Sequence, residues 1–293
     1  MRDPSPRPVT EFTYGGRQYR FLGYSPRDYI YRRIRDDHTF LEVETLEFIR
    51  NRRLAGTYVD VGANIGNHSV YFLSQTNCSK VTAIEGNPEI MPILAANLRQ
   101  NVGEEKSYRT FATFASTRGQ LFFNLADDQN VGSSFVTEVM VGANSVPVDC
   151  LSVDELVFDS DDVSLIKIDV EGHEIEVLKS AHGLLTNARP EICIESLHIP
   201  LHQLSSFMIG YNYLPIVTLP NYNVYFVAFP RFFILLIRAL ALLPLKIRSR
   251  VCWRVVRSFA LFTGRLKSKQ LEPVRAHSGH PACPVNPWLT TWE

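Results

Sequence analysis

"VDVGANIG", residues 59–66, is the stretch of sequence that decides the fold. Val59, Asp60 and Val61 are typical of the end of a short buried strand, and Gly62 and Gly66 then mark a tight turn. In doubly wound α/β sheets, ligands bind beyond the carboxyl ends of strands, at glycine turns of this kind. The stretch therefore predicts a ligand-binding turn, with an ordinary tight turn between strand and helix as the alternative.

The spacing of the turn narrows the class of ligand. A dinucleotide-binding turn needs glycine at its first, third and sixth positions, but counting from Gly62 places Asn64 third and Asn67 sixth. No Gly-Lys-Ser/Thr follows, so a phosphate-binding P-loop is excluded as well. Glu85 ends the next strand-like run, roughly 20 residues after the first glycine, where such folds place an acid against ribose hydroxyls. A ligand with a ribose but no pyrophosphate fits this pattern.

Strand and helix patterns alternate on both sides of the turn. Short apolar runs typical of strands lie near 57–62, 80–87, 108–116, 119–126, 163–172 and 190–197, and helical patterns lie near 64–75, 88–101 and 173–187. Residues 213–229 read as two strands joined by a Pro-Asn turn. A hairpin around Gly15-Gly16 and a helical lead-in over 28–54 precede the pattern. The alternation predicts an α/β fold with a mainly parallel, doubly wound sheet.

Composition and charge indicate an acidic body with a basic tail. The 293 residues are 45% hydrophobic and 20% charged, which is ordinary for a globular protein. Residues 1–230 hold 28 acidic and 19 basic side chains, whereas residues 231–293 hold 2 acidic and 11 basic ones. We therefore divide the chain into an N-terminal lead-in (1–55), a cofactor-binding domain (56–230) and a basic amphipathic extension (231–293).

The apolar and basic residues of the tail also bear on whether the protein binds a membrane. About 14 mostly apolar residues lie between Arg231 and Lys246, fewer than the roughly 20 that a spanning helix needs. Apolar residues interleaved with basic ones over 231–268 predict an interfacial element on an anionic membrane. Helices packed on the acidic body or on a second subunit are the alternative, and nucleic acid is disfavoured because the tail is so hydrophobic.

The cysteines and the N-terminus predict a cytoplasmic protein, peripheral on the membrane if the tail binds lipid. The five cysteines are scattered, with neither the paired spacing of a metal site nor a disulfide pattern. The first residues lack the apolar core of a signal peptide.

Several motifs in order resemble the FkbM-type family of S-adenosylmethionine-dependent methyltransferases: "FLEVETLEFI", "YVDVGANIGNHSVYFL", "AIEGNPE", "VGSSF", "LIKIDVEGHEIEVLKSA" and "PEICIE". The resemblance implies a class I methyltransferase sheet of seven strands with a reversed C-terminal hairpin. It also implies S-adenosylmethionine as cofactor, with Gly62, Asn64 and Gly66 facing its methionine part and Glu85 holding its ribose. Asp60 would orient the turn. Many relatives have Glu-Pro where this chain has Glu85-Gly86, so a looser turn is expected there.

Acids gather at the end of the strand in "LIKIDVEGHE". Transfer of a methyl group to an oxygen requires a base for the hydroxyl proton, and Asp169, Glu171, His173 and Glu174 are the candidates. Asp169 is favoured because it ends the apolar run. Glu174 has a second interpretation, because acids stabilise the first turn of a helix. Either interpretation keeps Asp169 at the centre of the predicted site.

Four further residues are candidates for contact with the methyl acceptor: Ser133, Ser134, Glu195 and His198. No metal is assigned, since no spacing demands one; a divalent metal bound by Asp169, Glu171, Glu195 and His198 is the alternative, because hard cations prefer oxygen ligands. The predicted activity is methylation of an oxygen of a small molecule, sugar or lipid-linked glycan. An NAD-dependent oxidoreductase and a non-catalytic, membrane-docking cofactor-binding scaffold are the alternatives.

Overall fold

The computed structural model describes residues 7–117, 119–124, 135–137, 139–140, 145–157 and 162–231. Two sets of predictions lie outside these residues. They are the assignment of Ser133 and Ser134 to the acceptor site and nearly all of the interfacial element predicted over 231–268.

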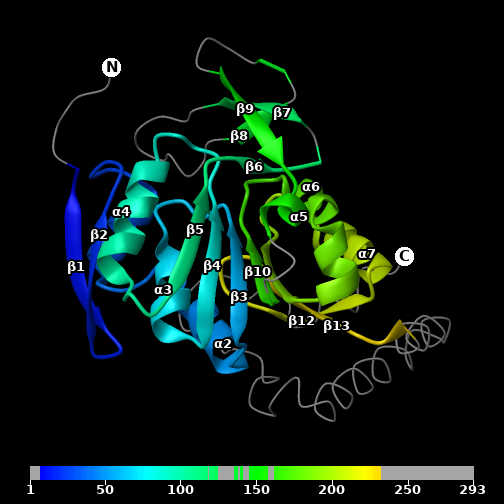
Figure 1. Cartoon of the computed structure of the whole chain (residues 1–293), viewed down its shortest axis with the longest axis horizontal. Helices are drawn as coiled ribbons and strands as arrows, with labels where there is room; N and C mark the ends of the chain where they lie inside the picture. Colours follow the sequence, from blue (N-terminus) through cyan, green and yellow to red (C-terminus); the bar gives the residue numbers. More distant parts are fainter. Residues whose placement is uncertain are drawn as a thin grey trace.

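A seven-stranded sheet forms the centre of the molecule (Figure 1). Its strands, in spatial order, are β5 (Ser107–Phe111), β4 (Cys78–Ile84), β3 (Gly56–Val61), β10 (Val163–Ile168), β11 (Glu191–Glu195), β13 (Asn223–Ala228) and β12 (Tyr213–Thr218). All neighbouring pairs are parallel except those made by β13, which runs antiparallel to both β11 and β12. The predicted class I methyltransferase sheet with a reversed C-terminal hairpin is confirmed.

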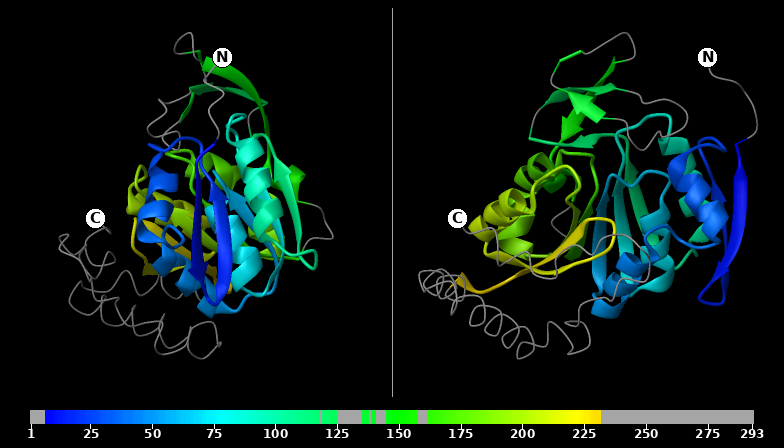
Figure 2. Two further views of the ribbon diagram at one scale, coloured as in Figure 1. Left: turned by 90° about the vertical axis from the view of Figure 1, so that its left-hand side faces the viewer. Right: turned by 180° about the vertical axis from the view of Figure 1, so that it is seen from behind.

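Helices cover both faces of the sheet, as the two views in Figure 2 show. One hydrophobic core packs the sheet against α2 (Val43–Arg52), α3 (Asn67–Gln75) and α4 (Met91–Asn101). The other packs it against α5 (Val153–Leu156), α6 (Glu174–Ser180), a π-helical turn (Leu184–Ala188) and α7 (Leu201–Gly210). Because side chains alternate along a strand, β10 buries Leu165 in the first core and Ile166 in the second.

The N-terminal hairpin packs beside α4. β1 (Val9–Tyr14) and β2 (Arg17–Leu22) pair around Gly15 and Gly16, both with positive φ, which confirms the predicted turn. The side chain of Asn97 accepts a hydrogen bond from Leu22 N (2.8 Å) and donates one to Leu22 O (3.0 Å). Asn101, one helical turn later, binds the backbone of Arg20 in the same way. These amides supply the partners that a neighbouring strand would offer to β2.

The predicted helical lead-in is two helices rather than one. α1 (Tyr29–Asp37) ends at His38, and α2 begins after Glu42, whose φ of 58° lies in the left-handed region. Between them Phe40 is buried in a cluster of aromatic rings from the hairpin and α3. The break therefore inserts Phe40 into the core and leaves Glu42 at the edge of the central sheet.

A second, four-stranded sheet follows β5. Its order is β6 (Phe114–Ala115), β9 (Ser145–Leu151), β7 (Gln120–Asn124) and β8 (Phe135–Thr137). The single strand predicted near 108–116 divides, because Thr113 donates a hydrogen bond to Asp149 O (2.7 Å) and β6 pairs with β9. Since β6 comes directly after β5, this small sheet stands above the carboxyl edge of the central sheet (Figure 1).

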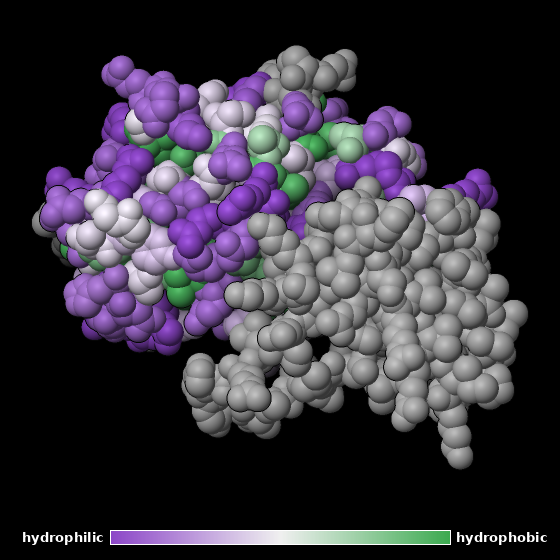
Figure 3. All heavy atoms as spheres, turned by 90° about the horizontal axis from the view of Figure 1, so that it is seen from below, coloured by the Kyte–Doolittle hydropathy of each residue, from purple (hydrophilic) through white to green (hydrophobic). Residues whose placement is uncertain are grey.

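The surface at the other end of the central sheet, away from the small sheet, is mainly polar. Seen from below, the described surface is mostly hydrophilic, with apolar residues in small separate patches (Figure 3). Within the described part of the chain, no helix is both long and apolar enough to span a membrane.

Candidate active site at the carboxyl edge of the sheet

The turn after β3 has the positive backbone φ angles that its glycines predict. Gly62, Asn64 and Gly66 have φ values of 81°, 48° and 89°. A Cβ atom at Gly62 would lie 1.8 Å from the backbone oxygen of Asp169, so only glycine fits. The turn therefore packs directly against the end of β10, where the predicted base is located.

The side chain of Asn67 has a structural role that was not predicted from the sequence. Its side-chain oxygen accepts a hydrogen bond from Leu41 N (2.9 Å), and its side-chain nitrogen donates one to Leu41 O (3.0 Å). One of the two residues that break the dinucleotide pattern thus attaches the turn to the segment before α2. This attachment places Glu42 beside the site.

Glu85 lies under the turn, 8% exposed. Its two carboxylate oxygens accept hydrogen bonds from Asn64 N (2.9 Å) and Asn87 N (2.7 Å). Burial raises the pKa of Glu85 to about 7, even though these two N–H groups lower it. Each oxygen keeps a lone pair for a further donor, such as a ribose hydroxyl.

Two more polar atoms near Glu85 are buried without a hydrogen-bond partner among the described residues. They are Nδ2 of Asn87, a donor, and Oδ1 of Asp60, an acceptor whose second oxygen is bound by Ser69 Oγ at 2.5 Å. Burial raises the pKa of Asp60. Buried polar atoms are normally paired, so these groups, together with Glu85, suit a polar ligand such as a nucleoside.

The turn after Glu85 is not loose, contrary to expectation. A Cβ atom at Gly86 would lie 2.2 Å from the ring of Phe114. The glycine lets the aromatic ring from β6 lie against the backbone, so the small sheet closes over this end of the turn.

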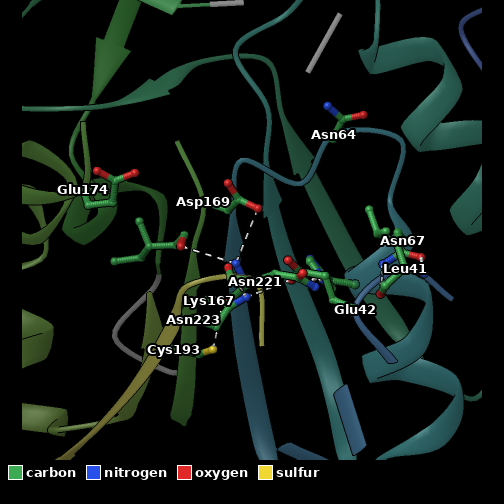
Figure 4. A network of polar contacts seen from close by, with 12 residues as sticks. Leu41, Glu42, Asn64, Asn67, Lys167, Asp169, Glu174, Cys193, Asn221 and Asn223 are labelled. Carbon is green, nitrogen blue, oxygen red and sulfur yellow. Dashed lines mark hydrogen bonds and ion pairs between the residues drawn. The ribbon is translucent and has the colours of Figure 1, made fainter. Parts of the chain in front are cut away.

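Lys167 lies beneath the predicted base (Figure 4). It is fully buried, and its Nζ lies 3.6 Å from Asp169 Oδ2 and 3.4 Å from Ile168 O. Burial alone would lower its pKa, but the charges of Asp169 and Glu42 raise it, with a smaller contribution from Glu195. Lys167 therefore remains a cation and is the counter-charge of the acid cluster. An ammonium group inside an apolar strand is a feature that the sequence analysis missed.

Glu42 is the second residue that was missed. Its Oε2 accepts a hydrogen bond from Asn223 Nδ2 (3.1 Å) and lies 3.3 Å from His68 Nε2. Burial alone would raise its pKa, but His68, Lys167 and Asn223 lower it. Glu42 is part of "FLEVETLEFI", so the motif was noticed, but the long separation of Glu42 and Lys167 in the sequence hid the electrostatic interaction between them.

Asp169 and Glu195 are two acids that interact with each other beside Lys167. The two residues end the adjacent strands β10 and β11. Burial, the charge of Asp169 and a hydrogen bond with Asp169 hold the pKa of Glu195 well above its usual range, although Lys167 lowers it. The protonated form of Glu195 is therefore favoured, and its partner Asp169 reaches the surface with 28% of its side chain exposed.

The methyltransferase FkbM domain model matches residues 60–215, slightly more than half of the chain. The chain belongs to the FkbM methyltransferase family. A relative, the hexuronic acid methyltransferase AglP of Haloferax volcanii, is 33% identical over 132 residues, which are 44% of this chain and 49% of AglP. The chain thus matches about half the length of this curated relative.

Two solved structures are similar in fold. The FkbM methyltransferase of Methylobacillus flagellatus has a TM-score of 0.44 and 18% identity, over 60% of this chain and 44% of its own. TYW2 of M. jannaschii, solved with AdoMet, has a TM-score of 0.35 and 12% identity, over 77% of this chain and 89% of its own.

Two other predicted residues of the FkbM domain meet at the rim of the site. Glu171 Oε2 lies 2.8 Å from His198 Nε2, which joins the loop after β10 to the loop after β11. Glu171 adopts a φ of 51°, and Gly172 follows with a φ of 100°. Burial raises the pKa of Glu171, although the hydrogen bond with His198 lowers it. Both side chains are partly exposed and can contact an acceptor.

The structure places His173 and Glu174 away from this rim. His173 lines a narrow pocket with Phe114 and Val170, on the side of the small sheet. Glu174 is 1% exposed, and its Oε1 accepts a hydrogen bond from Gly172 N (3.1 Å). In Figure 4, Glu174 lies apart from the network around Lys167. This position favours a role for Glu174 in shaping the loop. Within the described ranges, no group of three or more His, Cys, Asp or Glu side chains is placed to hold a metal ion.

Proposed function

We propose that the protein is an S-adenosylmethionine-dependent methyltransferase that methylates an oxygen of a small molecule, sugar or lipid-linked glycan. The observation that carries the proposal is the contact between the turn and the acid. The backbone of Asp169 occupies the space that a side chain at Gly62 would need, so the cofactor turn and the proposed base are immediate neighbours.

The residues around the turn fit the cofactor. Glu85 would accept hydrogen bonds from the ribose hydroxyls, and Asn87 Nδ2 would donate to a neighbouring acceptor atom. The turn from Gly62 to Gly66 would face the methionine part. When bound, the cofactor supplies an electrophilic methyl group attached to a sulfonium sulfur. The neutral thioether that remains after methyl transfer is a good leaving group.

The chain supplies position and a base. Asp169 would accept the proton of the acceptor hydroxyl as its oxygen bonds to carbon, and a positioned base contributes about 10²–10⁴ in rate. The Lys167 ammonium would balance the charge of the Asp169 carboxylate, and protonated Glu195 would orient that carboxylate by a hydrogen bond. Glu171 and His198 would hold further hydroxyl groups of the acceptor.

The test has two parts. Calorimetry should detect S-adenosylhomocysteine but not NAD; binding of NAD alone would favour the oxidoreductase. Mass spectrometry should then detect a methylated product when the protein is incubated with S-adenosylmethionine and a panel of sugars. Hexuronic acids belong first in that panel because AglP, the relative described above, is a hexuronic acid methyltransferase. Cofactor binding without any product from sugars, small molecules or glycolipids would favour the scaffold.

We also propose that residues 231–268 bind an anionic membrane surface, because basic and apolar residues alternate there. Removing residues 231–293 should release the protein from phosphatidylserine vesicles and leave binding of S-adenosylhomocysteine intact. Loss of the folded domain on truncation would instead indicate that the tail packs on the body.

A further inference from the structure

The turn between β12 and β13 holds a tyrosine in a costly conformation. Asn221 and Tyr222 are its two central residues, with φ values of 54° and 58°, and Asn223 N donates to Pro220 O (3.4 Å). Positive φ at both positions is the arrangement of a type I′ turn, in which asparagine followed by glycine is preferred. A bulky side chain in the left-handed region is a genuine outlier.

Contacts with the end of β11 hold this turn in place. The carbonyl oxygen of Tyr222 accepts hydrogen bonds from Ser196 N (2.9 Å) and Ser196 Oγ (3.0 Å). Asn223 pairs with Glu195 in the sheet, and its side chain donates to Asn221 O (3.3 Å). The strained turn is therefore attached to the same strand end that carries Glu195 and His198.

The ring of Tyr222 does not contribute to the core. It is 60% exposed, and Leu197, the residue after Ser196, is 49% exposed. Among the residues that the structure describes, the Tyr222 hydroxyl makes no hydrogen bond. Packing therefore does not explain why tyrosine occupies a position that suits glycine. Strained residues held by their surroundings are frequent at ligand sites.

We propose that Tyr222 and Leu197 form a platform that binds the pyranose ring of the methyl acceptor. This inference rests on the proposed function and specifies its acceptor as a cyclic sugar. The apolar C–H face of a pyranose packs on an aromatic ring, while its hydroxyl groups project sideways and donate to carboxylates. Tyr222 and Leu197 offer the apolar surface, and Glu171, with His198 beside it, offers the acceptors.

A glycine at position 222 removes the aromatic ring and at the same time relieves the backbone strain of the turn, so the two effects can be measured separately. Tyr222→Gly should raise the melting temperature, because glycine adopts the left-handed conformation freely, and should weaken sugar binding roughly tenfold. Tyr222→Phe should keep sugar binding. Arg53→Gly is the matched control, because Arg53 is exposed, has a φ of 56° and precedes the amino end of β3, at the opposite edge of the sheet. It should also raise the melting temperature but leave sugar binding unchanged.

The probes are methyl α-D-glucuronoside and methyl α-D-glucopyranoside, with acyclic sorbitol as the control. Saturation-transfer NMR on the full chain should show transfer to the C–H protons of one pyranoside or both, and none to sorbitol. The Tyr222→Gly variant should lose this transfer. Absence of transfer to either pyranoside in the wild-type protein, or unchanged transfer in a folded Tyr222→Gly variant, would overturn the platform.

Calorimetry with S-adenosylhomocysteine distinguishes this failure from that of the proposed function. If the nucleoside binds all variants equally while Tyr222→Gly retains the sugar, the platform alone is wrong. If the nucleoside fails to bind the wild-type protein, the proposed function is wrong, and the NMR result still decides whether Tyr222 binds sugar.

Discussion

The Nζ atom of Lys167 lies 3.6 Å from Oδ2 of Asp169, two residues further along the chain. Lys167 lies within the buried strand β10, and Asp169 is the first residue after it. The lysine is completely enclosed, whereas the acid reaches the surface of the site. The buried ammonium group thus interacts with the inner side of the Asp169 carboxylate and leaves the exposed side of that carboxylate available to a substrate.

Replacing this cation should destabilise the fold. Lys167→Met would leave Asp169 and Glu42 without their counter-charge, and loss of one partner from a buried ion pair costs about 3–5 kcal/mol. Urea denaturation should show that decrease in the free energy of unfolding. Lys179→Met is the control, because Lys179 pairs with Glu176 on the surface, where a pair contributes about 1 kcal/mol or less. Equal losses for both variants would contradict a central role for Lys167.

Asp169→Asn should keep the fold and cofactor affinity but reduce turnover by roughly 10²–10⁴, the usual contribution of a positioned base. His173→Ala should cost much less, because His173 faces the pocket beside Phe114. Turnover at saturating S-adenosylmethionine, measured with whichever acceptor yields product, checks both variants. A fully active Asp169→Asn protein would transfer the role of base to His198 or His173.

Affinity for S-adenosylhomocysteine should rise with pH near neutrality. Ribose hydroxyls donate to the ionised form of Glu85, whose pKa burial raises to about 7, so binding is favoured once the proton has left. Calorimetry between pH 6 and 8, in buffers of different ionisation enthalpy, should detect proton release on binding. Glu85→Ala should abolish this dependence and weaken binding by about 1–3 kcal/mol. Unchanged affinity would remove Glu85 from the ribose site.

The same carboxyl group should affect stability in the opposite direction. The folded-state pKa of about 7 exceeds the ordinary value of 4.5, so the folded protein holds this proton more tightly than the unfolded chain. The contribution is present below pH 4.5 and is lost as pH rises through 7. Without ligand, the free energy of unfolding should fall across this range in the wild-type protein. A Glu85→Gln variant that shows the same fall would assign it to another group.

Asn67→Gly would restore the glycine at the sixth position of the dinucleotide pattern. It should nevertheless lower the free energy of unfolding by about 1–3 kcal/mol, because the two backbone groups of Leu41 lose their partner. NAD binding should not appear. Asn77→Gly is the control, because Asn77 is exposed and makes a single 3.4 Å contact with Arg53 O. Thermal denaturation and calorimetry check the stability and the NAD binding.

The sequence predicted the central sheet well for a physical reason. Parallel strands buried on both faces are short continuous apolar runs, and each ends where a helix pattern begins. The N-terminal hairpin was predicted equally well, because its turn requires positive φ and Gly15 and Gly16 adopt it. The small sheet was missed because only β7 among its longer strands was expected, near 119–126, and its partner β9 was not recognised as a strand.

The candidate site was predicted only in part. Asp169, Glu171, Glu195 and His198 do lie near one another, because parallel strands bring their carboxyl ends to one edge. Lys167 was not recognised, because its importance depends on sheet register, which sets it opposite Asp60 on one side and Cys193 on the other. The strain at Tyr222 likewise depends on backbone angles that a Pro-Asn pair does not reveal.

Asn97 makes one further contact, from its side-chain nitrogen to the backbone oxygen of Ile65 (2.8 Å), in addition to those with Leu22. One amide therefore serves both the N-terminal hairpin and the glycine turn. A recombinant fragment cut at residue 56, close to where the family match starts, would strip partners from Asn97 and Asn101. It would also remove Phe40, whose ring packs on Tyr71 of α3. Expression and crystallisation work should accordingly retain the chain from before Val9, since the first strands help to hold the glycine turn in shape.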